Sequence, residues 1–120
     1  MEAKMPCKVM IMAGGTGGHV FPALAVAEEL RTADASVSWL GTRAGIEAEL
    51  VPSNGFKLNY LDIEGIRGRG LIALLKAPLL LWRSIRQSLL VLSEYQPQVV
   101  LGMGGFASGP GAVAARLKGI

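Results

Sequence analysis

Two glycine-rich stretches, each placed between a short apolar run and a helical pattern, limit the fold of this chain more than any other feature. The first, residues 14–19, reads GGTGGH, and the second, residues 102–111, reads GMGGFASGPG. A strand followed by a glycine-rich turn and a helix is the phosphate-binding unit of many α/β folds. Because such turns follow the carboxyl ends of parallel strands, both stretches are predicted to lie at one edge of the same sheet.

The rest of the chain alternates between strand-like and helix-like segments. Short apolar or β-branched runs predict strands at Cys7–Ala13, Ser36–Gly41, Phe56–Asp62 and Gln98–Met103. Helical patterns occupy Phe21–Ala33, Gly45–Ser53, Leu71–Tyr95 and Pro110–Lys118. This order predicts a Rossmann-like α/β domain, in which helices cover both faces of a parallel sheet and right-handed crossovers join the strands.

Composition narrows the class of protein. The chain has 120 residues, which fits one domain, and its mean hydropathy of +0.42 predicts that some apolar surface stays unburied. A net charge of +3 without a block of basic residues suits phosphate or anionic lipid, and no nucleic acid is expected. Cys7 is the single cysteine, so no internal disulfide forms, and we expect a core thiol in a reducing compartment. Neither a signal peptide nor a membrane-spanning helix is predicted.

The first glycine turn is the stronger signal for a ligand. Four of its six residues are glycines, which is more than a tight turn with positive φ requires. Bare N–H groups and the positive end of the following helix, with Pro22 in its first turn, would hold a phosphate. A dinucleotide fingerprint fits poorly, because Val20 replaces its last glycine and the second strand ends without an acidic ribose partner. A P-loop is excluded, since no Gly-Lys-Ser or Gly-Lys-Thr occurs.

The second turn supplies more bare backbone, the hydroxyl of Ser108 and another helix start, so the two turns together would accommodate a diphosphate. Taken alone, it is also explained as a close-packed helix start. His19 is the only histidine, and its place beside the first turn makes it a candidate general base for a reacting hydroxyl. A role in capping the helix or positioning phosphate, without proton transfer, fits its position equally well.

Other catalytic centres find no support in the sequence. One histidine, one cysteine and scattered carboxylates give no recognisable spacing of metal ligands. Ser108 has no obvious base partner, and the GxSxG elbow of serine hydrolases does not occur. We therefore expect neither a metal site nor a cofactor.

The segment from Leu71 to Arg86 is too apolar for a helix with one buried face, because its leucines fall on several sides. It predicts a peripheral membrane contact in which apolar side chains enter the interface and basic ones reach lipid headgroups. The residues expected to make this contact are Leu75, Lys76, Leu79, Trp82, Arg83 and Arg86. The alternatives are a core helix kinked at Pro78, or a face covered by a missing domain or a partner. Residues 65–70, GIRGRG, are expected to form a mobile basic loop.

Together these motifs resemble the MurG family, the UDP-N-acetylglucosamine transferases of peptidoglycan synthesis. The residues that carry the resemblance span almost the whole chain and are 14–22, 40–42, 47–52, 65–70 and 102–111. The resemblance implies a GT-B glycosyltransferase with two Rossmann-like domains around a cleft. Residues 1–120 would then be the N-terminal, acceptor-binding domain, and the C-terminal, donor-binding domain would be absent from the chain.

Members of this family transfer N-acetylglucosamine from UDP-N-acetylglucosamine to lipid I, which is undecaprenyl-diphosphate-linked N-acetylmuramoyl-pentapeptide. The reaction inverts the anomeric centre and forms lipid II, without a metal. The resemblance therefore implies UDP-N-acetylglucosamine, lipid I and an anionic membrane surface as partners, at the cytoplasmic face of the bacterial plasma membrane. The oligomeric state stays open. We expect the chain alone to be inactive.

The resemblance also implies roles for single residues. Thr16, Gly17 and Gly18 would face the donor, and His19 would be the catalytic residue, with an acidic candidate for the base expected beyond Ile120. The residues expected to hold the acceptor diphosphate come from both turns and are Gly14, Gly15, Gly104, Gly105, Ser108 and Gly109. The alternatives are a related transferase acting on another lipid acceptor, and a non-catalytic phosphate-binding module that docks on membranes.

Overall fold

The computed structural model describes residues 6–61, 71–105 and 107–120, and within α3 it leaves the side chains of residues 72–74 undescribed. Strands and helices alternate as expected. In chain order they are β1 (Lys8–Ala13), α1 (Gly17–Thr32), β2 (Ser36–Thr42), α2 (Glu47–Ser53), β3 (Lys57–Leu61), α3 (Leu71–Tyr95), β4 (Val99–Gly104) and α4 (Ser108–Leu117). The basic loop expected at residues 65–70, and the expected strand end at Asp62, lie outside the described residues.

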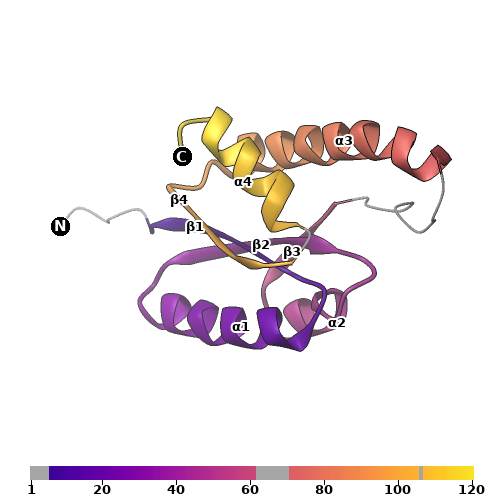
Figure 1. The fold of residues 1–120 in the computed structure, drawn as a ribbon. Helices are drawn as coiled ribbons and strands as arrows, with labels where there is room; N and C mark the ends of the chain where they lie inside the picture. The colour runs from indigo at the N-terminus through magenta and orange to yellow at the C-terminus, as the bar shows by residue number, and fades with distance from the viewer. Residues whose placement is uncertain (1–5, 62–70, 106) are drawn as a thin grey trace.

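The four strands form a parallel sheet in the order β3-β2-β1-β4. The chain starts at β1, moves outward through β2 and β3, and then crosses back to place β4 on the other side of β1. Right-handed crossovers in these two directions put α1 and α2 on one face and α3 on the other, where α4 packs beside α3 (Figure 1). The reversal also makes β1 and β4 neighbours, so the glycine turns that follow them lie side by side at the carboxyl edge.

The central strand β1 is buried on both faces, which explains its continuous apolar sequence. Because alternate residues of a strand point to opposite faces, Val9 and Ile11 pack in the α1–α2 layer, whereas Met10 and Met12 pack in the α3–α4 layer. The first layer is completed by buried residues Val20, Ala23, Leu24, Ala27, Trp39, Val51 and Phe56. The second contains Leu40, Leu61, Leu92, Ala107, Ala114 and Ala115.

Helix α1 begins at Gly17, four residues before the expected start, so Pro22 lies inside the helix and not in its first turn. The reason is that the Thr16 carbonyl oxygen accepts hydrogen bonds of 3.1 Å from the N–H groups of both His19 and Val20. The second half of the glycine turn is thereby drawn into the helix. Proline is tolerated at this point because it removes only one helical hydrogen bond close to the N-terminus.

Cys7 was expected in the core, but it is exposed. The strand begins one residue later, at Lys8. The Cys7 carbonyl oxygen accepts a hydrogen bond of 2.8 Å from the Ser36 N–H. The apolar run in the sequence therefore extends beyond the part of the strand that the helices cover.

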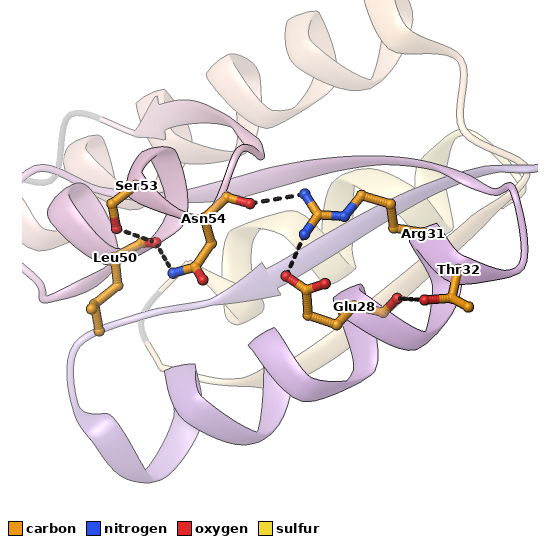
Figure 2. A network of polar contacts seen from close by, with 6 residues as sticks. All are labelled: Glu28, Arg31, Thr32, Leu50, Ser53 and Asn54. Carbon is orange, nitrogen blue, oxygen red and sulfur yellow. Dashed lines mark hydrogen bonds and ion pairs between the residues drawn. The ribbon is translucent and has the colours of Figure 1, made fainter.

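The C-terminal ends of α1 and α2 are joined by Arg31, at the edge of the sheet away from the glycine turns. Its guanidinium pairs with Glu28 and donates a hydrogen bond of 2.8 Å to the carbonyl oxygen of Asn54 (Figure 2). In the same network, the side chains of Ser53 and Asn54 donate to the Leu50 carbonyl oxygen (Figure 2). These contacts fasten the α1–α2 layer at its outer end.

Helix α3 buries a face that contains two serines. Ser84, Ser88 and Leu92, spaced four residues apart, are fully buried, and the two serine hydroxyls donate to the carbonyl oxygens of Leu80 and Ser84. The large apolar residues of its first half lie on the opposite side, where Leu75 is 71% exposed and Leu79 and Trp82 are each 61% exposed. This confirms that apolar surface stays unburied, and it argues against a core role for this half of the helix. Within the described residues, no helix has the length and hydropathy to cross a bilayer.

Candidate functional site

The two glycine turns touch each other at the carboxyl edge of the sheet. The N–H of Gly14 donates a hydrogen bond of 3.3 Å to the carbonyl oxygen of Gly104. Gly105 lies even closer, since a Cβ atom placed on it would be 2.1 Å from the Gly14 carbonyl oxygen. Gly104 and Gly105 also have φ angles of +113° and +92°, which disfavour any residue with a side chain. The expectation that both turns share one edge is confirmed, and their backbones form a single interlocked unit.

Ser108 stands at the start of α4 and ties the second turn to the end of β1. Its hydroxyl oxygen accepts a hydrogen bond of 3.1 Å from the Gly104 N–H. The hydroxyl lies 2.9 Å from the carbonyl oxygens of both Met12 and Gly104, and its single proton can be donated to one of them at a time. In this arrangement the hydroxyl stabilises the turn, and its role toward a diphosphate stays a prediction.

His19 is the last residue of the first glycine stretch, and its ring contacts the second turn. The ring packs on the backbone of Gly104, where a Cβ atom would come within 2.6 Å of the His19 Cδ2 atom. The His19 side chain is half-buried, and its Nδ1 atom is buried without a hydrogen-bond partner among the described residues. The structure therefore brings together the candidate base and both glycine turns, as a shared site requires.

The residues expected to face the donor form the accessible end of α1. Thr16 and Gly18 are exposed, Gly17 is half-buried, and the Thr16 side chain makes no capping hydrogen bond. The first turn of α1 contains no acidic residue, so its own side chains leave the positive end of the helix uncompensated. Gly109, at the start of α4, is likewise exposed, with open space where a Cβ would lie. The N-terminal ends of α1 and α4, which favour anions, therefore flank the junction of the two glycine turns.

Glu47, for which no role was expected, lies in the wall of this site. Its side chain is fully buried, and one carboxyl oxygen accepts a hydrogen bond of 3.0 Å from the Gly15 N–H. The other oxygen accepts hydrogen bonds of 2.9 Å from both the N–H and the hydroxyl of Thr42. A signal for this group was present in the sequence as the glycines at positions 14, 41 and 45, which surround the carboxyl group. No local pattern links those glycines to a glutamate.

The expected membrane-contact residues lie on α3, and all six have exposed side chains. Leu75, Leu79 and Trp82 are spaced by four and three residues, so they form one stripe along the helix. With 25 residues α3 is about 37 Å long, whereas a six-residue strand such as β1 spans about 20 Å. The N-terminal half of α3 therefore projects past the carboxyl edge of the sheet, at the same end of the molecule as the glycine turns (Figure 1).

Among the described residues, no group of three or more His, Cys, Asp or Glu side chains is placed to hold a metal ion. The site therefore consists of helix ends, bare glycine backbone, one imidazole and one buried carboxyl group.

A parallel sheet in this strand order, with two glycine turns interlocked at its carboxyl edge, is a Rossmann-like domain, the fold expected for one domain of a GT-B glycosyltransferase. The sequence narrows the class further. Residues 9–120 match the glycosyltransferase family 28 N-terminal domain, and the chain belongs to that family.

Similar proteins from several bacteria are named UDP-N-acetylglucosamine--N-acetylmuramyl-(pentapeptide) pyrophosphoryl-undecaprenol N-acetylglucosamine transferase. The chain is 59% identical over 113 residues to the protein of that name from Shewanella woodyi, covering 94% of this chain and 31% of that protein. It is 55% identical over 113 residues to the one from Histophilus somni, covering 94% of this chain and 32% of that protein. The chain thus spans about a third of the length of the curated relatives it matches.

Solved structures agree with this placement. The crystal structure of Acinetobacter baumannii MurG superposes with a TM-score of 0.84 at 43% identity, covering 96% of this chain and 34% of that chain. CalG4, the calicheamicin glycosyltransferase, superposes with a TM-score of 0.61 at 22% identity, covering 92% of this chain and 28% of that chain. The second likeness concerns the fold alone.

Proposed function

We propose that this chain is the N-terminal, acceptor-binding part of an inverting glycosyltransferase. In the complete protein, it would help to move N-acetylglucosamine from UDP-N-acetylglucosamine to lipid I and so form lipid II for peptidoglycan synthesis. One observation carries the proposal: the two glycine turns interlock beside the His19 ring in a chain that is 59% identical to a transferase named for this reaction. A second family relative and the MurG crystal structure support the same assignment.

The proposed chemistry is a single displacement at the anomeric carbon of the donor sugar. The 4-hydroxyl oxygen of the acceptor forms the new glycosidic bond, the bond to UDP breaks, and the hydroxyl proton passes to a base. His19 is the candidate for that base within this chain, because its ring lies at the junction of the two turns. The positive end of α1 at Thr16, Gly17 and Gly18 would stabilise the diphosphate of the departing UDP.

The acceptor diphosphate is proposed to lie along the interlocked turns. The N–H groups of Gly14, Gly15 and Gly104 already donate to groups of the protein. These glycines would therefore contribute mainly space for close approach, together with Gly105. Positive potential would come from the start of α4, where Gly109 is exposed.

We propose that α3 contacts the anionic surface of the membrane that holds the lipid acceptor. Leu75, Leu79 and Trp82 supply an exposed apolar stripe, and the exposed cations Lys76, Arg83 and Arg86 are close to it in sequence. The N-terminal half of α3, which carries the stripe, lies at the same end of the molecule as the glycine turns (Figure 1). A lipid-linked diphosphate would thus reach the turns while its chain stays in the bilayer, which corresponds to a peripheral protein on the cytoplasmic face of the plasma membrane.

The same stripe favours a second candidate from a different class, a non-catalytic module that docks on membranes and binds phosphate. A transfer assay separates the two. The complete gene product that contains this chain is incubated with UDP-N-acetylglucosamine and a short-chain lipid I analogue, and the disaccharide product is measured. The transferase proposal expects turnover that depends on both substrates. Absence of turnover, with retained vesicle binding, would leave the docking module as the function.

A further inference from the structure

We propose that Glu47 is a positioning residue of the transfer site, whose buried carboxyl group holds the first glycine turn in the shape that the reaction needs. The inference rests on the proposed function, because it assigns Glu47 a share in sugar transfer. Glu47 would touch neither substrate, since its side chain is fully buried. It would act through Gly15 and the residues that follow.

The hydrogen bonds of Glu47 show that position 47 requires a group with two acceptor oxygens. Gly15 N–H, Thr42 N–H and the Thr42 hydroxyl all donate to its two oxygens, at 3.0, 2.9 and 2.9 Å. Both oxygens act only as acceptors, which is the pattern of a carboxylate and not of an amide. The carboxylate therefore joins the turn after β1 to the end of β2. Gly15 and Glu47 are 32 positions apart in the sequence.

The surrounding backbone is shaped to receive this group. A Cβ atom on Gly14, Gly41 or Gly45 would come within 2.3, 2.7 or 2.0 Å of Glu47 side-chain atoms. Three segments therefore omit side chains around a single carboxyl group. A buried polar group with all its partners supplied holds its neighbours in one geometry, because any displacement leaves donors without acceptors.

Short contacts link Gly15 to the second glycine turn and to the His19 ring. Gly14 precedes Gly15 and interlocks with Gly104 and Gly105 of the second turn. Two residues after Gly15, α1 begins at Gly17 and carries His19, whose ring packs on Gly104. A change in the anchor at Gly15 should therefore move both the helix end and the imidazole relative to the second turn.

The anchor also decides which N–H groups remain for a ligand. Gly15 donates its N–H to Glu47, and Gly14 donates its N–H to Gly104, so neither is free for a phosphate. Glu47 thus directs an anion toward the accessible end of α1 at Gly17 and Gly18.

The test uses Glu47→Gln in the complete gene product. An amide offers one acceptor and one donor, so one contact becomes donor against donor. With its oxygen toward Thr42, the amide keeps the hydrogen bonds from both the Thr42 N–H and the Thr42 hydroxyl. We therefore expect the amide nitrogen to face Gly15, so that the Gly15 hydrogen bond is the one that is lost. We expect kcat/KM for sugar transfer to fall about 10- to 100-fold, mainly through kcat, because small misplacements of reacting groups cost this much. We also expect the Gly15 amide to exchange faster with solvent.

Two controls separate positioning from folding. Glu49→Gln removes a charge from the same helix at an exposed position and should leave transfer and Gly15 exchange unchanged. Leu92→Ala weakens the buried α3–α4 layer away from the turns and should lower the melting temperature without lowering kcat of the folded protein. If Glu47→Gln does not fold, Thr42→Val removes only the hydroxyl donor and should produce a smaller loss of kcat at unchanged fold.

The outcomes separate this inference from the proposed function. Full transfer by a folded Glu47→Gln variant would overturn it, as would a loss that only follows the folded fraction, as in Leu92→Ala. If the wild-type protein transfers no sugar, the proposed function fails. The inference is then decided by titrating inorganic pyrophosphate into the wild-type protein and the Glu47→Gln variant and following the NMR signals of the backbone amides. Weaker shifts at Gly17 and Gly18 in Glu47→Gln would then support the anchor, and unchanged shifts would overturn it.

Discussion

The backbone of Gly105 lies against that of Gly14 so closely that a Cβ atom on Gly105 would be 2.1 Å from the Gly14 carbonyl oxygen. The contact joins two turns that are 91 positions apart in the sequence, and it exists because β4 pairs with β1 in the sheet. The end of β1 and the turn after β4 thereby become one rigid surface. Its tolerance to substitution is the first property to test.

Gly105→Ala should destabilise this junction. The methyl group meets backbone that cannot rotate away, and the φ angle of +92° is strained for alanine. We expect the free energy of unfolding in urea to fall by about 2 kcal/mol or more. Gly109→Ala is the matched control, because open space surrounds that Cβ position and α4 already contains the residue, so its stability should change by less than about 1 kcal/mol. Equal stability of the two variants would contradict the close approach.

The role of His19 is tested by two substitutions in the complete gene product. His19→Ala should lower kcat strongly, since a general base typically contributes about 10²- to 10⁴-fold to rate. His19→Asn keeps a hydrogen-bonding group but cannot accept the proton, so it should stay almost as slow. If the ring only positions ligand, the asparagine variant should recover most of the rate and its loss should be mainly in KM. Near-normal kcat for His19→Asn across the pH range would remove His19 as the base.

The apolar stripe of α3 should bind anionic vesicles. Replacing Leu75, Leu79 and Trp82 with serine should weaken co-sedimentation with such vesicles, because each substitution removes exposed apolar surface from the contact. Added salt should weaken the part contributed by Lys76, Arg83 and Arg86, as screening reduces attraction to lipid headgroups. The matched control is the triple serine variant of Val113, Leu117 and Ile120, which are exposed at and beyond α4. A protein whose co-sedimentation changes with neither treatment would not use α3 for membranes.

The 120-residue chain by itself should transfer no sugar. It spans about a third of the curated relatives it matches, and most of the donor site is expected in a second domain. The measurement is transfer from labelled UDP-N-acetylglucosamine to a lipid I analogue, with the complete gene product assayed in parallel. Turnover by the isolated chain would show that residues 1–120 contain a sufficient donor site.

The apolar stripe of α3 shows how much a pattern in the sequence can predict. The bounds of α3, Leu71–Tyr95, agree with the expected helix, and the excess of leucines over what one buried face can hold correctly indicated exposed apolar surface. Which leucines stay exposed followed from packing, because the small side chains of Ser84 and Ser88 allow α3 to lie close to its layer on that side. Cys7 shows the opposite case, since an apolar run alone does not say where the covering helices end.

By itself the sequence determined the order of strands and helices, the parallel sheet and the two glycine turns at one edge, because these follow from side-chain periodicity and from backbone freedom along short stretches. Only the tertiary structure decided that Gly14 and Gly105 interlock, that His19 lies on Gly104, and that Glu47 anchors the first turn. The physical reason is distance along the chain. Each of these contacts joins segments whose approach is set by the pairing of β1 with its two neighbouring strands, and no local pattern records which distant backbone will fill the space that a glycine leaves.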